Sequence, residues 1–205
     1  MKFYISAANY RHEIEQYELD NLYDENILYM DRYNFTGDIN IYASKDFDED
    51  IQDIGLIQAT FLDEKMISDE DAGSLARIAD AIDVDISRAF EYLIHSDIYK
   101  ALLCAEHNQL PLHSCYISHF WISPDYRSQG LGTHLLENLD RIYQHMFNTY
   151  INCMVVYPKP SSKKEGWKDA EEEIQARKRM IRFFKINGFI ALGDSGFYAR
   201  NYASD

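Results

Sequence analysis

A short glycine-containing turn near the middle of this 205-residue chain constrains its fold more than any other feature. The run Ser114–Ile122 is rich in aromatic and β-branched residues, which is typical of a strand buried on both faces. A turn over Ser123–Gln129 follows, and Gly130–Phe147 then has apolar residues at helical spacing. Because the first N–H groups of a helix have no internal partner, this arrangement predicts a backbone site for an anion.

The residues of this turn favour a phosphate or diphosphate ligand. Gly130 and Gly132 have no Cβ, so a ligand can approach the backbone closely. Arg127 adds a planar, permanently charged donor, and Thr133 adds a hydroxyl. A Walker A loop is excluded because no Lys follows the second glycine. A dinucleotide fingerprint is disfavoured because Leu135 stands where a third glycine or alanine is needed.

The rest of the second half predicts a mixed α/β sheet. Tyr150–Tyr157 is expected to be another buried strand, and Asp169–Asn187 a long helix that ends at Gly188. Phe189–Leu192 and Phe197–Tyr202 are expected to close the chain as a hairpin. Strand-helix-strand units require crossover connections and some parallel pairing, whereas the hairpin adds antiparallel strands.

The first half predicts further strands. Met1–Ala7, Asp38–Ser44 and Gly55–Asp63 are strand-like, and the acidic turn between the last two favours an antiparallel hairpin or meander. Ile14–Tyr23 and Asn26–Tyr33 have weak helical patterns. One domain is the expectation for a chain of this length.

The segment 68–104 is predicted to hold two helices between the strands of the first and second halves. Ser68 and Asp71 have the spacing of a capping box at the start of the first helix. Asp85 can cap the second helix. The apolar residues of that helix fall at helical spacing: Ile86, Ala89, Phe90, Leu93 and Ile94.

The charge distribution limits the partners of the chain. Residues 1–100 hold 8 Lys and Arg against 23 Asp and Glu, whereas residues 101–205 hold 12 against 11. A half this acidic repels nucleic acid and attracts cationic molecules, although an acidic surface kept for solubility explains the same pattern.

Other compositional signals bound the class of protein. No apolar run is long enough to cross a bilayer, and the N-terminus lacks the apolar core of a secretory signal, so a cytoplasmic protein is expected. Cys104, Cys115 and Cys153 are odd in number and have no C-x-x-C spacing. Buried reduced thiols are therefore expected in place of a disulfide framework or a metal site.

The central turn resembles the core motif of the GNAT superfamily of acyl-CoA N-acyltransferases, which runs roughly V-x-P-x-Y-R-x-x-G-x-G before a helix with paired leucines. The residues in register are Ile122, Pro124, Tyr126, Arg127, Gly130, Gly132, Leu135 and Leu136. A second family signature, F-Y-x-x-x-G-F, is matched by Phe183-Phe184-Lys-Ile-Asn-Gly188-Phe189 except at its tyrosine. The two matches cover roughly residues 110–192.

The resemblance implies a single domain over residues 1–205, with a central mixed sheet flanked by helices, a CoA-binding core at 110–192 and a helical insertion at 68–104. It implies transfer of an acetyl group from acetyl-CoA directly to an amine, without a metal. The positions it implies for CoA contact are Phe120, Ile122, Arg127, Gln129, Gly130, Leu131, Gly132, Thr133 and Arg177, the last with Lys178 and Arg179 beside it on the long helix.

The resemblance leaves the acid and the base open. Phe184 replaces the tyrosine that often serves as the acid, and Tyr198 is a replacement candidate. The usual positions for a base hold Tyr116 and Ser118, neither of which is a good base at neutral pH. His119 has a ring that titrates near neutral pH, but strand alternation is expected to turn it to the other face from Tyr116 and Ser118.

Three functions agree with these signals. The first is an acetyltransferase for a cationic amine such as a polyamine, an aminoglycoside or a lysine-bearing protein. The second is a CoA-binding protein without transferase activity, which Phe184 and the missing base favour. The third is an acidic interaction or inhibitor protein on the same fold. Nucleic-acid and membrane partners are not expected, and a homodimer stays open.

Overall fold

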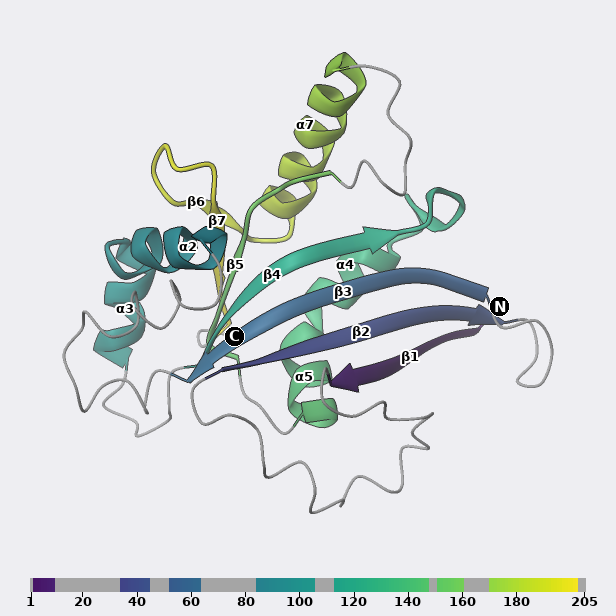
Figure 1. The fold of residues 1–205 in the computed structure, drawn as a ribbon, viewed down its shortest axis with the longest axis horizontal. Coiled ribbons are helices and arrows are strands. Elements are labelled where there is room, and N and C mark those ends of the chain that lie inside the picture. Colours follow the sequence, from purple (N-terminus) through teal and green to yellow (C-terminus); the bar gives the residue numbers. More distant parts are fainter. Residues whose placement is uncertain are drawn as a thin grey trace.

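The computed structural model describes residues 2–9, 34–44, 52–63, 84–105, 113–147, 151–160 and 170–202. Within these ranges the strands form one seven-stranded sheet in the order β1-β2-β3-β4-β5-β7-β6, with helices packed against it (Figure 1). This confirms the mixed α/β sheet that the sequence predicts. The expected helices at Ile14–Tyr23 and Asn26–Tyr33, and the first helix of the segment 68–104, lie outside the described residues.

Four long strands form an antiparallel meander: β1 (Lys2–Asn9), β2 (Asn34–Ser44), β3 (Gln52–Asp63) and β4 (His113–Ile122). The antiparallel pairing of β2 with β3 was predicted. β2 begins four residues before the alternating run Asp38–Ser44. Pairing explains the extra length, because Asn34 lies opposite Leu62 and the ladder with β3 continues from there.

β4 is paired along its whole length on one side but only partly on the other. The parallel partner β5 (Cys153–Val156) pairs with Ser114–Ile117, and β4 continues for five residues beyond that pairing. The expectation that this strand is buried on both faces therefore holds for its first half alone. Ser118 is exposed and the next three residues are partly exposed, because the neighbouring strand has turned away.

A β-bulge at Ser118 changes the alternation of side chains along β4. Gln58 lies opposite His119 and Ala59 opposite Ile117, so Ser118 is an extra residue. Ile117 before the bulge and Phe120 after it consequently contact the same core cluster.

The bulge overturns one expectation about His119. Tyr116 belongs to the core on the opposite face of the sheet, and the shifted alternation places His119 on that face with it. The prediction that His119 points away from the face of Tyr116 is therefore wrong. No feature of the local sequence predicts the extra residue.

The helices after β4 follow the sequence with one interruption. A 3₁₀ turn (Pro124–Tyr126) leads into α4 (Leu131–Glu137) and α5 (Leu139–Phe147), so the predicted helix at 130–147 is broken at Asn138. The Asn138 side chain donates to the carbonyl of His134, at 2.9 Å, and competes with the helical pattern there. The long helix α7 (Ala170–Ile186) ends before Gly188, whose φ of 82° confirms the predicted left-handed position.

The insertion contributes α2 (Val84–Ile94) and α3 (Asp97–Ala105). The sequence predicts one helix where these two stand. Ser96 separates them, because its hydroxyl accepts from the N–H of Tyr99, at 3.2 Å, and starts a new helix. No helix within the described ranges combines the length and the apolar character needed to cross a membrane.

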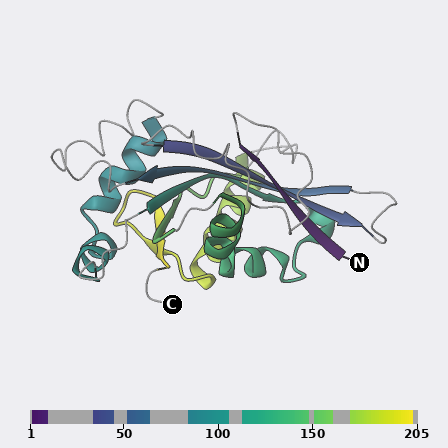
Figure 2. The same cartoon turned by 90° about the horizontal axis from the view of Figure 1, so that it is seen from below.

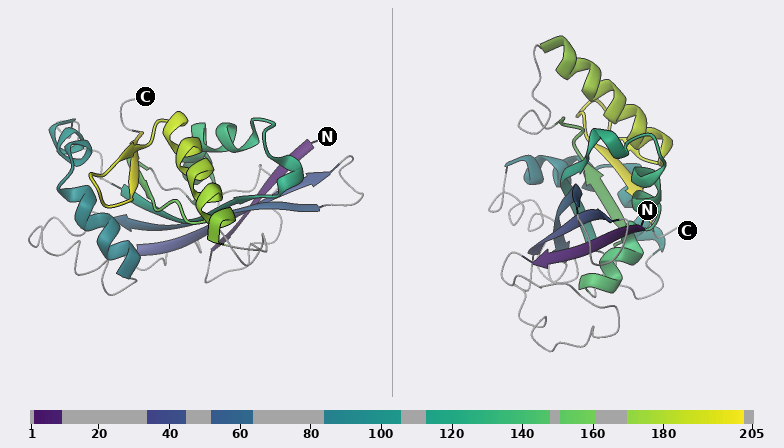
Figure 3. Two further views of the ribbon diagram at one scale, coloured as in Figure 1. Left: turned by 90° about the horizontal axis from the view of Figure 1, so that it is seen from above. Right: turned by 90° about the vertical axis from the view of Figure 1, so that its right-hand side faces the viewer.

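Two cores hold the helices on the sheet. α4 and α5 cover one face of the long strands through the larger cluster, the main core, which includes Leu136, Tyr143 and Phe184 (Figure 2). α2 packs on the opposite face near the closing strands β6 (Ile190–Ala191) and β7 (Tyr198–Asn201). α7 stands beyond β4, on the side away from β3 (Figures 1 and 3).

Candidate active site

A cavity of about 450 Å³ opens where β4 and β5 separate. The free half of β4 supplies His119, Phe120, Trp121 and Ile122. The turn and the start of α4 supply Arg127, Ser128, Gly130, Gly132 and Thr133. The loop after β5 supplies Lys159 and Pro160, and α7 supplies Ala176, Arg179, Met180, Phe183 and Ile186.

The backbone of the turn presents free donors to this cavity. Gly130 is the N-cap of α4 with a φ of 82°, and a Cβ built there would meet nothing within 4 Å. The N–H groups of Leu131, Gly132 and Thr133 are in the first turn of the helix and so have no intrahelical acceptor, and no side chain caps the helix. Ser128 also has a positive φ, of 60°. These observations fit the predicted anion site.

Three side-chain hydrogen bonds fix the turn. The Nε of Arg127 donates to the carbonyl of Ile122 at 2.7 Å, and the Tyr126 hydroxyl donates to Gln52 Oε1 at 2.9 Å. Gln129 Nε2 donates to the carbonyl of Asp125 at 2.9 Å. The turn is therefore held in shape by the protein itself, which reduces the ordering cost of binding a ligand.

Close packing joins the turn to α7. A Cβ on Gly132 would stand 3.1 Å from Phe183 Cζ and 3.2 Å from Ile122 Cδ1, so this position needs a small residue. Phe183 also lies 5.6 Å, between ring centroids, from Phe120 on β4. Phe184 is fully buried next to Phe183 and is a core residue outside the cavity lining.

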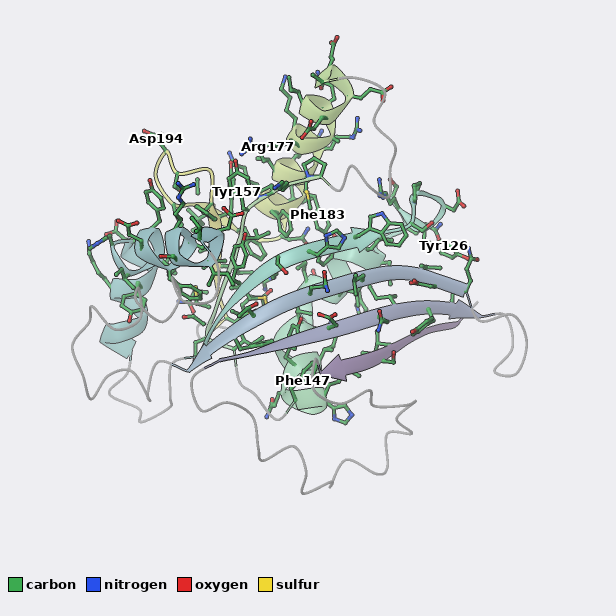
Figure 4. The ribbon with its side chains drawn as sticks, viewed as in Figure 1. Tyr126, Phe147, Tyr157, Arg177, Phe183 and Asp194 are labelled. Carbon is green, nitrogen blue, oxygen red and sulfur yellow. The ribbon has the colours of Figure 1, made fainter. Side chains whose placement is uncertain are left out.

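Three of the lining residues are cations: Arg127, Lys159 and Arg179. Their charges suit a polyanionic ligand beside the backbone donors. Arg177 faces elsewhere. Its Nη2 donates to the Tyr157 hydroxyl at 2.8 Å, and its guanidinium lies 4.7 Å from the centroid of the same ring (Figure 4). Of Arg177, Lys178 and Arg179, it is Arg179 that lines the cavity.

The four catalytic candidates differ in their position relative to the cavity. His119 lines the cavity. Tyr116 is buried in the opposite core, with its ring 6.4 Å from that of Phe197. Ser118 is exposed and donates to the carbonyl of Gln58 at 3.3 Å. Tyr198 packs against the main core beside Lys185 and is not among the lining residues.

Most of the other residues predicted to contact CoA line the cavity. Phe120, Ile122, Arg127, Gly130, Gly132 and Thr133 line the cavity. The Leu131 side chain packs against the core, and the Gln129 side chain donates a hydrogen bond within the turn. These two residues would therefore contact a ligand through their backbone N–H groups. Trp121, Lys159 and Met180 also line the cavity, and no motif in the sequence marks them.

Comparison with known proteins agrees with this geometry. Residues 89–158 match the Acetyltransferase (GNAT) family, a span that includes β4, the glycine turn, α4, α5 and β5. Over this segment, about a third of the chain, the protein is similar to the GNAT acetyltransferases. The similarity supports an acetyltransferase activity with acetyl-CoA as the donor, and leaves the acceptor unspecified.

Other comparisons are more distant. No curated protein sequence matches this chain. Among solved structures, a chain from the crystal structure of a KacTA–DNA complex aligns with 99% of this chain and 95% of its own length, at 11% identity and a TM-score of 0.43.

The two arginines on α7 give a paired test of the cavity. Arg179→Ala is expected to weaken acetyl-CoA binding about tenfold, because one charge-assisted contact to a phosphate is lost. Arg177→Ala is expected to leave the Kd within about twofold, since Arg177 is engaged with Tyr157. Isothermal titration with acetyl-CoA measures both. A larger effect at Arg177 than at Arg179 would contradict this placement of the two side chains.

Proposed function

We propose that this protein transfers the acetyl group of acetyl-CoA directly to a primary amine on a cationic acceptor. The observation that supports this most strongly is a single cavity that joins the glycine turn to His119 along the free half of β4. One end offers donors for phosphates, and the other offers a side chain that can accept a proton at neutral pH.

The residues of the cavity fit the parts of CoA in order. The N–H groups from Gln129 to Thr133 would hold the diphosphate, with Arg127, Lys159 and Arg179 near the phosphates. The free strand edge beyond Ile117 offers backbone groups to the amides of the pantetheine arm, as an added strand does. Phe183 and Met180 supply the apolar wall beside it.

The chemistry requires one proton acceptor. The neutral amine nitrogen attacks the thioester carbonyl carbon, so a C–N bond forms and the C–S bond breaks. His119 takes the proton that the nitrogen loses, and the departing thiolate takes a proton from the imidazolium or from water. Phe184 has no proton to give, but a thiol with a pKa near 8.5 leaves without a dedicated acid.

A cationic acceptor is supported by the charge of the chain. The net charge is -14, and the acidic residues are concentrated in the half of the sequence that supplies β1 to β3. Acidic surroundings raise the local concentration of a cationic substrate and its rate of association. The acceptor therefore belongs to the class of polyamines, aminoglycosides or lysine side chains.

An amine panel tests this function. The purified chain is incubated with acetyl-CoA and either spermidine, an aminoglycoside, a lysine peptide, a neutral aromatic amine or an alcohol. Acetylated product is measured by mass spectrometry. We expect product from at least one cationic amine, and a rate that falls as salt rises. Tight CoA binding without product from any amine would indicate a CoA-binding protein without transfer. Equal rates with neutral amines would contradict a cationic acceptor.

A further inference from the structure

A polar row crosses three strands on the face of the sheet opposite α4 and α5. Asp38 on β2 lies opposite Gln58 on β3, and Gln58 lies opposite His119 on β4. The flanking residues Ile39 and Ile57 turn to the other face and belong to the main core. Because neighbouring strands are about 4.8 Å apart, the first and last members of the row are about 10 Å apart at the backbone.

Gln58 stands between the two ends of this row and is bonded to one of them. Its Nε2 donates to Asp38 Oδ2 at 2.9 Å, which fixes the carboxylate. Asp38 Oδ1 is buried and has no hydrogen-bond partner among the described residues. Hydrogen bonds therefore compensate the negative charge of Asp38 only in part. Gln58 lies on the strand between Asp38 and His119.

The charge of Asp38 acts on His119. Burial raises the pKa of the Asp38 carboxyl, while the hydrogen bond from Gln58 and the nearby positive charge of His119 act to lower that pKa. The attraction is mutual, so ionised Asp38 favours the imidazolium form of His119. Arg127, Lys159 and Arg179 line the same cavity as His119.

We propose that Asp38 and Gln58 are positioning residues for His119, and that the row across β2, β3 and β4 keeps the imidazole able to accept a proton in a cavity lined with cations. This inference rests on the proposed function. Without the carboxylate, His119 would be a weaker base where the amine must lose its proton. Asp38 acts through His119 and does not contact the reacting atoms.

The variant Asp38→Asn tests the proposal, because asparagine keeps an acceptor for Gln58 and removes the charge. The His119 ring is titrated by NMR in both proteins, with His119→Gln to assign its signal. We expect the midpoint of the His119 titration to move to lower pH by about 0.5–1 pH unit in Asp38→Asn. The acidic limb of the kcat/KM profile should move by the same amount, and its plateau should fall roughly 3- to 10-fold. The KM for acetyl-CoA should stay within about twofold.

Stability separates this role from a purely structural one. Because the folded-state pKa of Asp38 is raised, the ionised carboxylate costs free energy of folding at pH values above that pKa, and the cost disappears below the unfolded-state pKa. Asp38→Asn should therefore melt at the same temperature as the wild type or higher at pH 7. A structural role predicts the reverse, a lower Tm with an unmoved His119 titration.

Two further variants sharpen the result. Asp194→Asn makes the same change at an exposed position in the turn between β6 and β7, and should leave the His119 titration unmoved (Figure 4). Asp38→Glu keeps the negative charge, so the midpoint of its His119 titration should lie close to the wild-type value. An unchanged midpoint in Asp38→Asn overturns the proposal even if the enzyme is fully active. Absence of acetyl transfer by the wild type would instead overturn the proposed function, and the NMR titration would still decide whether Asp38 acts on His119.

Discussion

Gly130→Glu is expected to abolish acetyl-CoA binding, with a Kd at least about 100-fold higher, while the chain stays folded. The substitution places a carboxylate where the diphosphate would contact the backbone donors of the turn. Loss of two charge-assisted hydrogen bonds, at about 1.5–3 kcal/mol each, already accounts for that factor. Space for the new side chain exists, because a Cβ at this position meets nothing within 4 Å. Isothermal titration measures the affinity, and circular dichroism checks the fold.

Gly193 provides a matched control for this substitution. It also has a positive φ, of 58°, and a Cβ there also meets nothing within 4 Å, but it lies in the turn between β6 and β7 and outside the cavity lining. Gly193→Glu therefore introduces the same strain and the same charge. We expect it to lower stability about as much as Gly130→Glu and to leave acetyl-CoA affinity within about twofold. Equal losses of affinity in both variants would show that strain, not position, is the cause.

His119→Ala is expected to lower kcat about 10²- to 10⁴-fold at neutral pH, the usual contribution of a positioned general base. The Kd for acetyl-CoA should change by no more than about threefold, because the contacts proposed for the phosphates are made by the glycine turn and its neighbouring cations, not by His119. Steady-state rates with the best amine of the panel, together with titration of acetyl-CoA, measure the two quantities separately. The rate of the variant should also rise at high pH, where more of the amine is already neutral.

Tyr198→Phe is the control for this effect. Tyr198 was the sequence candidate for an acid, and its ring packs against the core outside the cavity lining. We expect the variant to keep kcat within about threefold of the wild type. A large loss at Tyr198 with little loss at His119 would transfer the proton chemistry to the closing strand and contradict the assignment of His119.

Local signals in the sequence predicted much of the fold. The strand at Ser114–Ile122, the glycine turn and the following helix depend on neighbours within about twenty residues, and all three are present as β4, the turn and α4 with α5. Gly188 was expected to end a helix in the left-handed region because glycine adopts it without strain, and it does so.

Features that depend on pairing across the sheet could not be predicted from the sequence pattern. The bulge at Ser118 arises from the register of β4 against β3, and it moves His119 to a different face. The row of Asp38, Gln58 and His119 likewise exists only because three strands align in register. Neighbouring residues on a helix differ in direction by about 100°, so the choice between Arg177 and Arg179 depended on how α7 is rotated against β4.

A crystal structure of the chain with acetyl-CoA would show whether the backbone N–H groups of residues 129–133 hold the diphosphate, as we propose. We expect diphosphate oxygens within hydrogen-bond distance of the N–H groups around Gly130, and the acetyl group near His119. Acetyl-CoA bound elsewhere, or a diphosphate that makes no contact with this turn, would contradict this proposal.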